Sequence, residues 1–180
     1  MKLGFIGVGN MGKAILEGLL RSGKVSSTDV FVRNSSDRST RSVAEETGAV
    51  FCKSLEEVVE NSDIVFLGVK PYLVGTVLDK VSLSLENKIV ISMAAAVEIN
   101  DLEKKIPGTK IVRIMPNTPV KIGSGVVGVT FNSLVAAEEK TLVLDLLNNL
   151  GIAEEILEKD MAALTALSGS GPAYGYLFIE

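Results

Sequence analysis

Six residues near the start of the chain have the types and spacing of a phosphate-binding turn. Gly7-Val8-Gly9-Asn10-Met11-Gly12 fits the pattern G-x-G-x-x-G and stands between an apolar run and an amphipathic stretch of helix length. In such a turn the first glycine permits the tight bend, the second lets the backbone approach a pyrophosphate, and the third lets the helix pack on the strand. Free amides and the positive end of the helix dipole attract phosphate there. The pattern predicts a dinucleotide site; the alternative is a glycine-rich turn without a ligand.

The end of the second apolar run bears on the choice of cofactor. An NAD-binding chain usually places Asp or Glu about 20 residues after the glycines, on the ribose 2′-hydroxyl. This chain instead reads Val32-Arg33-Asn34-Ser35-Ser36. The cation of Arg33 and the neutral donors of Asn34 and Ser35 favour the 2′-phosphate of NADPH, with NADH as the second possibility. Asp37 would repel that phosphate if it pointed toward it, but it is equally explained as a helix cap; the alternative for the whole segment is a solvated loop.

Three further clusters of residues stand at the ends of later apolar runs. They are Gly68-Val69-Lys70-Pro71, Met93-Ala94-Ala95-Ala96 and Met115-Pro116-Asn117-Thr118-Pro119. Ligands of open α/β sheets lie outside the carboxyl ends of the strands, so these clusters are candidates for the nicotinamide side of the cleft. Each also has a structural explanation: a solvated lysine before a helix, close packing of alanines, or a turn stiffened by two prolines.

Histidine is absent from the sequence, and cysteine occurs once, as Cys52. Without imidazole, Ser-His-Asp and Cys-His nucleophilic sites and histidine-ligated metal sites are excluded. Cys52 lacks a histidine base, so we expect a buried core cysteine and not a nucleophile. No metal site is expected, and the residues assign no catalytic side chain.

The charge and the apolar runs limit the partners. The net charge is −4 and the pI about 5.0, so we expect no nucleic-acid partner. The apolar runs fall short of the roughly 18 residues that span a bilayer. The opening residues lack the features of a secretory signal, and one cysteine rules out an internal disulfide framework. We therefore expect a cytoplasmic protein.

Apolar runs alternate with helix-length amphipathic stretches, which predicts an α/β fold with a Rossmann-type, doubly wound, mostly parallel sheet. The predicted strands are Lys2–Val8, Asp29–Val32, Ala49–Phe51, Ile64–Val69, Ile89–Ala95, Lys110–Ile114, Val126–Thr130 and Gly151–Ile156. The predicted helices are Met11–Ser22, Asp37–Thr47, Leu55–Asn61, Leu73–Val81, Ile99–Lys105 and Val135–Leu150.

The character of the chain changes near Glu158. Asp160–Leu167 has a helical pattern, Ser168-Gly169-Ser170-Gly171-Pro172 is expected to interrupt it, and Ala173–Ile179 resumes an apolar run. We divide the chain into an NAD(P)-binding domain, residues 1–157, and the first segment of a helical domain, residues 158–180. Apolar surface of this size normally has a partner, so we expect either a truncated chain or a segment that docks on another subunit.

Four segments, taken in order, resemble the pyrroline-5-carboxylate reductase family. They are Gly4–Gly12, Val69–Pro71, Arg113–Pro119 and Thr165–Tyr174, of which the last two are the specific ones. The resemblance runs along nearly all of the chain. It implies an NAD(P)H enzyme that reduces a small molecule, 1-pyrroline-5-carboxylate, to L-proline in the last step of proline synthesis. It also implies a homodimer or higher homo-oligomer formed through the C-terminal helical segment.

The resemblance assigns the pyrophosphate to Ile6–Met11, the adenosine ribose or its phosphate to Asn34 and its neighbours, and the nicotinamide half to Gly68–Pro71 and Ala94–Ala96. The residues expected to contact the cofactor are Ile6, Gly7, Val8, Gly9, Asn10, Met11, Gly12, Arg33, Asn34, Ser35, Gly68, Val69, Lys70, Pro71, Ala94, Ala95, Ala96 and Asn117. The chain departs from the family twice. The usual Ala-Ala-Gly is Ala94-Ala95-Ala96 here, and an Asn near the third helix is replaced by Ser54 or Leu55.

The family carries a second, all-helical domain that dimerises and holds the substrate. We expect most of that domain to be absent from these 180 residues, and the chain to retain cofactor binding with weak or no turnover. A protonated cyclic imine accepts hydride without a strong protein acid, which fits the missing histidine. The alternatives are a non-catalytic NADP-binding module, or another Rossmann reductase such as a 3-hydroxyacid dehydrogenase or a deazaflavin-dependent NADP reductase.

Overall fold

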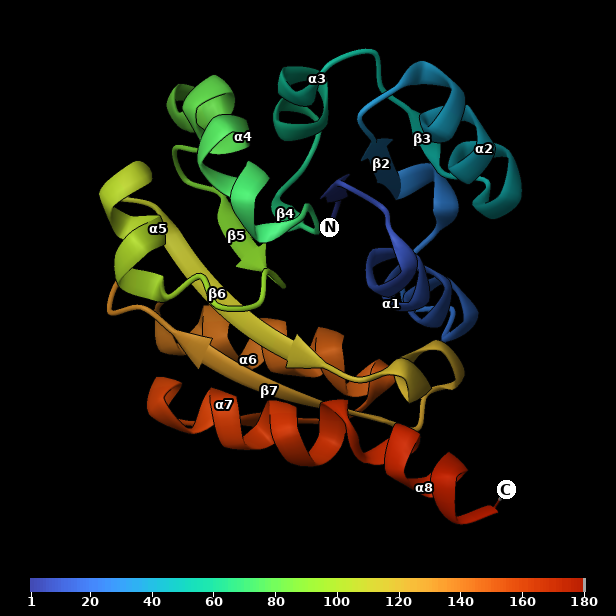
Figure 1. Ribbon diagram of the computed structural model, residues 1–180. Helices are drawn as coiled ribbons and strands as arrows, with labels where there is room; N and C mark the ends of the chain where they lie inside the picture. Colours follow the sequence, from blue (N-terminus) through green and yellow to red (C-terminus); the bar gives the residue numbers. More distant parts are fainter. Residues whose placement is uncertain (180) are drawn as a thin grey trace.

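Eight strands form one sheet in the computed structural model, which describes residues 1–179 (Figure 1). The strand order is β3-β2-β1-β4-β5-β6-β7-β8. Pairing is parallel from β3 to β6, whereas β7 runs antiparallel to β6 and β8 runs parallel to β7. The strands are β1 Leu3–Ile6, β2 Val30–Arg33, β3 Val50–Phe51, β4 Ile64–Leu67, β5 Ile89–Ser92, β6 Lys110–Pro116, β7 Gly125–Phe131 and β8 Gly151–Glu155. The predicted fold class is confirmed.

Helices connect the strands in the predicted order. They are α1 Asn10–Arg21, α2 Asp37–Thr47, α3 Leu55–Glu60, α4 Val74–Val81, α5 Ile99–Lys105, α6 Ala137–Leu147, α7 Met161–Leu164 and α8 Gly171–Ile179. Four strands end earlier than predicted: β1, β4 and β5 by two or three residues, and β8 by one. β1 stops at Ile6 because Gly7 turns the chain with φ of +84°, and β5 stops at Ser92 because a loop with Ala96 at φ of +59° follows.

The helices cover both faces of the sheet. Residues of α1, α2 and α6 belong to one buried apolar cluster and residues of α3, α4 and α5 to the other. β1, β4 and β5 are buried along their whole length, as continuously apolar parallel strands require. In the first cluster the rings of Phe5 and Phe66, on adjacent strands, stack with centroids 4.6 Å apart.

The strand register places the carboxyl ends of several strands at the same edge of the sheet. Ile6 lies opposite Arg33 and Leu67, and Leu67 lies opposite Ser92, which in turn lies opposite Arg113. The loops that leave these strands therefore share one edge of the sheet. This edge is where ligands bind in open α/β sheets.

The expected interruption at Ser168–Pro172 is a wide turn and not a break. A π-helical turn, Thr165–Gly169, joins α7 to α8, and the Ser170 N–H donates to the Thr165 carbonyl at 3.2 Å. α7 consequently runs beside β7, and α8 continues past the end of that strand toward the C-terminus, both drawn in red in Figure 1. Gly128 of β7 makes the close approach possible, since a Cβ there would overlap Leu164. No helix within residues 1–179 is both long and apolar enough to cross a membrane.

Candidate functional site

The first three glycines shape the turn between β1 and α1. Gly7 adopts φ of +84°, and its N–H donates to the Arg33 carbonyl at 2.8 Å. A Cβ on Gly7 would lie 2.7 Å from Val69 Cγ1, and one on Gly12 would lie 3.0 Å from the Gly7 carbonyl oxygen. Gly7 and Gly12 are therefore required by the packing of the turn itself.

Gly9 has no such internal reason to be glycine. Its φ of −80° suits any residue, and a Cβ built there meets no atom within 4 Å. Gly9 is also the N-cap of α1, which has no side-chain cap and no acidic residue in its first turn. By contrast, Ser36 and Ser54 cap α2 and α3 through their hydroxyls. Open space at Gly9, beside uncapped helix amides, fits a phosphate that approaches the backbone from outside.

Asn34 links the end of β2 to the glycine turn. Its Oδ1 accepts a hydrogen bond from the Val8 N–H at 2.5 Å, and its Nδ2 donates to the Ser39 carbonyl at 3.3 Å. The Asn34 backbone N–H donates to Thr40 Oγ1 at 3.0 Å. The side-chain amide thus holds the turn in shape, a role that the sequence did not indicate.

Arg33 is paired with Asp37. Arg33 Nη1 donates to Asp37 Oδ1 at 2.6 Å and to the Cys52 carbonyl at 3.3 Å. Ser36 caps α2, so Asp37 is its first residue and not its cap. The hydrogen bond from Arg33 holds the pKa of the Asp37 carboxyl below its usual value. The repulsion expected between Asp37 and a 2′-phosphate is therefore partly offset, because the Asp37 carboxylate is paired with the Arg33 guanidinium.

A cavity of about 320 Å³ opens beside the glycine turn. Six of the predicted residues line it: Ile6, Gly7, Arg33, Asn34, Ser35 and Val69. Its other walls were not among the predicted contacts. Leu55 comes from the start of α3, and the segment that leads into and forms α4 supplies Leu73, Thr76, Val77 and Lys80. Four of these have the spacing i, i+3, i+4, i+7 of one helix face, so the pattern was available in the sequence.

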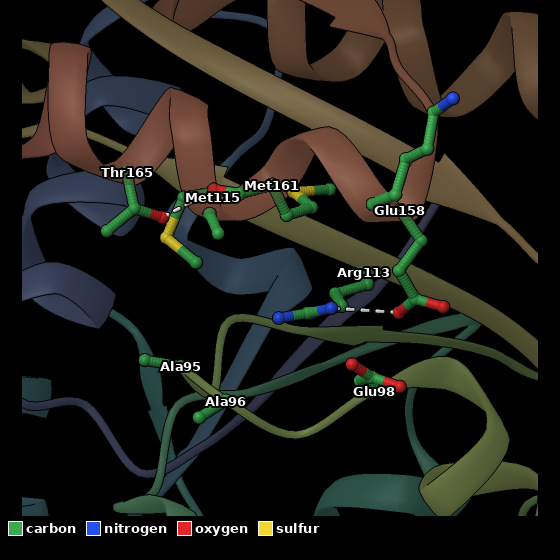
Figure 2. A pocket seen from close by; sticks show the side chains of 10 residues that line it. Ala95, Ala96, Glu98, Arg113, Met115, Glu158, Met161 and Thr165 are labelled. Atoms are coloured by element: carbon green, nitrogen blue, oxygen red, sulfur yellow. Dashed lines mark hydrogen bonds and ion pairs between the residues drawn. The ribbon is translucent and has the colours of Figure 1, made fainter.

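A second cavity, of about 420 Å³, lies between the β5–α5 loop, β6 and α7 (Figure 2). Of the predicted residues it contains only Ala95 and Ala96. Arg113 and Glu158 face one another in its wall, with Nη1 to Oε1 at 2.8 Å. The Arg113 side chain is 7% exposed and its Nε has no hydrogen-bond partner. Sequence analysis assigned neither side chain a role in the site, because their pairing joins positions 45 residues apart.

The remaining predicted residues lie around these cavities. Gly68 packs directly on the Gly7 carbonyl, Lys70 and Pro71 are exposed, and Ala94 is buried. The Asn117 amide is committed at both ends, because Oδ1 accepts from the Val126 N–H at 2.9 Å and Nδ2 donates to the Ser168 carbonyl at 3.2 Å. This geometry favours the structural explanation for Asn117, which ties the turn after β6 to the π-helical turn.

Cys52 is fully buried, and burial raises the pKa of its thiol to about 11. The burial agrees with the expected core cysteine, and the raised pKa keeps the thiol protonated near neutral pH. Within residues 1–179, no three His, Cys, Asp or Glu side chains are grouped so that they could hold a metal ion.

Comparisons with known proteins agree with this geometry. Residues 2–96 match a family model described as "NADP oxidoreductase coenzyme F420-dependent". A pyrroline-5-carboxylate reductase of Escherichia coli (strain K12) is 39% identical over 181 residues, which cover 99% of this chain and 67% of the relative. That of Glycine max is 35% identical and is covered to 65%. The chain thus spans about two thirds of the length of the relatives it matches.

Solved structures give the same result. Plasmodium falciparum pyrroline carboxylate reductase with NADP bound superposes with a TM-score of 0.91 at 37% identity, covering 99% of this chain and 66% of that one. A prephenate dehydrogenase of A. aeolicus superposes with a TM-score of 0.78 at 17% identity, covering 99% of this chain and 68% of that one. At that identity the second likeness shows the fold alone.

Proposed function

Since the chain belongs to the pyrroline-5-carboxylate reductase family, we propose that it binds NADPH and presents the nicotinamide to 1-pyrroline-5-carboxylate. The reaction of the family is the NAD(P)H-dependent reduction of this cyclic imine to L-proline. In the proposal, residues 1–157 bind the cofactor, and the helical segment that follows connects them to the substrate-binding part of the enzyme.

The observation that carries the proposal is the open space at Gly9. A side chain at this position would meet no neighbouring atom of the chain, and yet the residue is glycine. It also stands at the start of a 12-residue helix that has no side-chain cap. A pyrophosphate that contacts the backbone explains both features, because a side chain at Gly9 would occupy its place and a side-chain cap would compete for the same amides. The amides of Asn10 and Met11 would then donate to the phosphates.

The two cavities would receive the two halves of the cofactor. The apolar walls of the 320 Å³ cavity, Leu73 and Val77, suit an adenine ring, and Arg33 and Lys80 place positive charge at its rim for a 2′-phosphate. Ala95 and Ala96 are exposed at the 420 Å³ cavity and would allow close approach of the flat nicotinamide ring.

NADPH supplies the hydride when bound. The side chains of this chain then have to bind and orient the cofactor and the substrate, since a protonated imine needs no strong protein acid.

Hydrophobic surface on α8 supports the further proposal that members of a homo-oligomer meet there: Leu177, Phe178 and Ile179 are 73%, 91% and 83% exposed. The proposal includes a cytoplasmic location, as expected from the sequence.

A matched pair of variants at Gly9 tests the proposal. Asp and Asn have nearly the same shape and both cap helices well, so neither Gly9→Asp nor Gly9→Asn should lower the free energy of unfolding. Both fill the space at Gly9, and Asp adds like-charge repulsion. Titration of NADPH fluorescence should show an affinity loss of about 100-fold or more for Gly9→Asp and about tenfold for Gly9→Asn.

Unchanged NADPH affinity in both variants would refute the site. An assay of NADPH oxidation with 1-pyrroline-5-carboxylate then asks whether these residues also catalyse. Formation of L-proline excludes the non-catalytic NADP-binding module, whereas saturable NADPH binding without turnover is expected of that module and equally of a cofactor domain assayed without its substrate-binding part.

A further inference from the structure

One carboxylate oxygen joins three elements that are distant in the sequence. Glu158 Oε1 accepts a hydrogen bond from Arg113 Nη1 at 2.8 Å and another from the Ile99 backbone N–H at 2.9 Å. Glu158 begins the helical segment that leads into α7, Arg113 belongs to β6, and Ile99 is the first residue of α5. The hydrogen bonds span 45 and 59 residues of chain.

The bond to Ile99 fixes one end of the β5–α5 loop. The other end of this loop is held where the Ala94 N–H donates to Ser92 Oγ at 3.3 Å. Between these points Ala95 and Ala96 are exposed, and Ala96 is held at φ of +59°, a conformation unfavourable for a residue with a Cβ. The loop therefore depends on its anchors for its shape, and Glu158 provides one of them.

The bond to Arg113 compensates a buried cation. The Arg113 side chain is 7% exposed, and its Nε has no partner at all. Glu158 is the acidic partner of this guanidinium, and Figure 2 shows the two side chains facing one another above the loop that carries Ala95 and Ala96. Without Glu158 the guanidinium would stay buried with an unbalanced charge, which is costly. Arg113 and the loop are thus both sensitive to the position of Glu158.

The same cavity could instead hold an anionic ligand of its own, but its charges argue against that. Its wall has Arg113 and Lys159 against Glu98 and Glu158, so the formal charges cancel. Arg113 already has an acidic partner. The arrangement fits an internal connection better than a separate binding site.

We propose that Glu158 is a positioning residue for the nicotinamide half of the cofactor. Its carboxylate couples the start of the C-terminal helical segment to the β5–α5 loop, so that the loop takes its receptive shape when that segment is docked. This inference rests on the proposed function, because it assumes that Ala95 and Ala96 border the nicotinamide ring.

Two ligands separate positioning from general stability. NADP⁺ contains the nicotinamide, and adenosine 2′,5′-bisphosphate contains only the adenosine part of the same cofactor. In calorimetric titrations, Glu158→Ala should weaken NADP⁺ binding about tenfold and leave adenosine 2′,5′-bisphosphate binding within about twofold of the unmodified chain. Glu158→Gln keeps an acceptor for the Ile99 N–H without the charge, and should weaken NADP⁺ binding by about threefold.

The matched control is Glu155→Gln, which removes the carboxylate of a surface ion pair with Lys140 and should leave both affinities unchanged. Should Glu158→Ala fail to fold, Glu158→Gln decides the question. Equal weakening of both ligands, or unchanged NADP⁺ affinity, would overturn the inference and leave the proposed function standing. No binding of either ligand to the unmodified chain would overturn the proposed function and, with it, the inference.

Discussion

The two cavities at the carboxyl edge of the sheet are built in different ways. The cavity beside the glycine turn takes its polar wall from residues that stand next to recognisable motifs, such as Gly7 and Arg33. The cavity beside the β5–α5 loop depends on a contact between Arg113 and Glu158 that spans 45 residues. Arg113 opens one of the recognised segments, but Glu158 stands in none of them. One region is therefore specified by local backbone geometry, and the other by charge pairing between distant segments.

This difference has an energetic consequence. At Gly7 and Gly12 of the glycine turn, sterics dominate the free energy of unfolding, so small added groups should be harmful there and charge changes nearby mild. At the second cavity, a largely buried ion pair dominates, so loss of one partner should cost more than loss of volume. Four substitutions, ordered by the size of the expected effect, test this contrast.

Gly7→Ala should have the largest effect. The added Cβ would lie 2.7 Å from Val69 Cγ1 and 2.9 Å from the Gly68 carbonyl carbon, at a φ of +84° that disfavours any side chain. We expect a loss of about 3 kcal/mol in the free energy of unfolding, measured by urea denaturation, together with loss of NADPH binding. A stable variant with normal affinity would show that sterics do not control this turn.

Arg113→Ala should come second. The change leaves Glu158, which is 28% exposed, with only the Ile99 N–H as partner and removes a buried side chain. We expect a loss of about 2 kcal/mol in urea denaturation. The control is Lys140→Ala, which breaks an exposed pair with Glu155 and should cost less than about 0.5 kcal/mol. Similar losses in the two variants would contradict the special role of the Arg113–Glu158 pair.

Asp37→Asn should change cofactor preference with little effect on stability. Asp37 neutralises Arg33 across 2.6 Å, so its removal frees the guanidinium for a 2′-phosphate. Fluorescence titration should show NADPH binding strengthened about threefold and NADH binding unchanged. The reciprocal variant, Arg33→Ala, should weaken NADPH much more than NADH. Equal changes for both cofactors would remove Arg33 from the 2′-phosphate site.

Ala96→Gly should have the smallest effect and should be favourable. Glycine adopts φ near +59° without penalty, and the relief exceeds the entropy that glycine adds to the unfolded chain. We expect a gain of about 0.5 kcal/mol, or a rise in Tm of about 1–2 °C. The neighbouring Ala95→Gly lacks the positive φ and should lower the Tm instead. A lower Tm for Ala96→Gly would mean that the loop is not strained.

The sequence predicted the parts of the fold that depend on periodicity and local turns. The alternation of buried runs and amphipathic stretches predicted all the strands of the sheet and the helices α1 to α6, because each element must bury one face. The glycine turn was predicted for a similar reason, since Gly7 is dictated by a backbone conformation. Arg33, Asn34 and Val69, which were expected to contact the cofactor, line one cavity.

The parts that the sequence did not predict depend on contacts between distant residues. The run Ser168–Pro172 resembles a helix break by composition, yet the chain absorbs it in a π-helical turn beside β7. Asn117 was predicted to display its amide in the cleft, but that amide is used in bonds to Val126 and Ser168. No sequence pattern assigned a role to Glu158, because that role depends on its hydrogen bonds to residues of β6 and α5.

The most direct test of the account is an amide NMR titration of the unmodified chain with NADP⁺. The account predicts saturable shifts of the backbone N–H signals of Gly9, Asn10 and Met11, because these amides would face the pyrophosphate. Signals of residues on the opposite edge of the sheet, such as Lys88 and Gly108, should stay in place. Saturation without any shift at Gly9–Met11, or no change in any signal, would contradict the claim that this turn binds the cofactor.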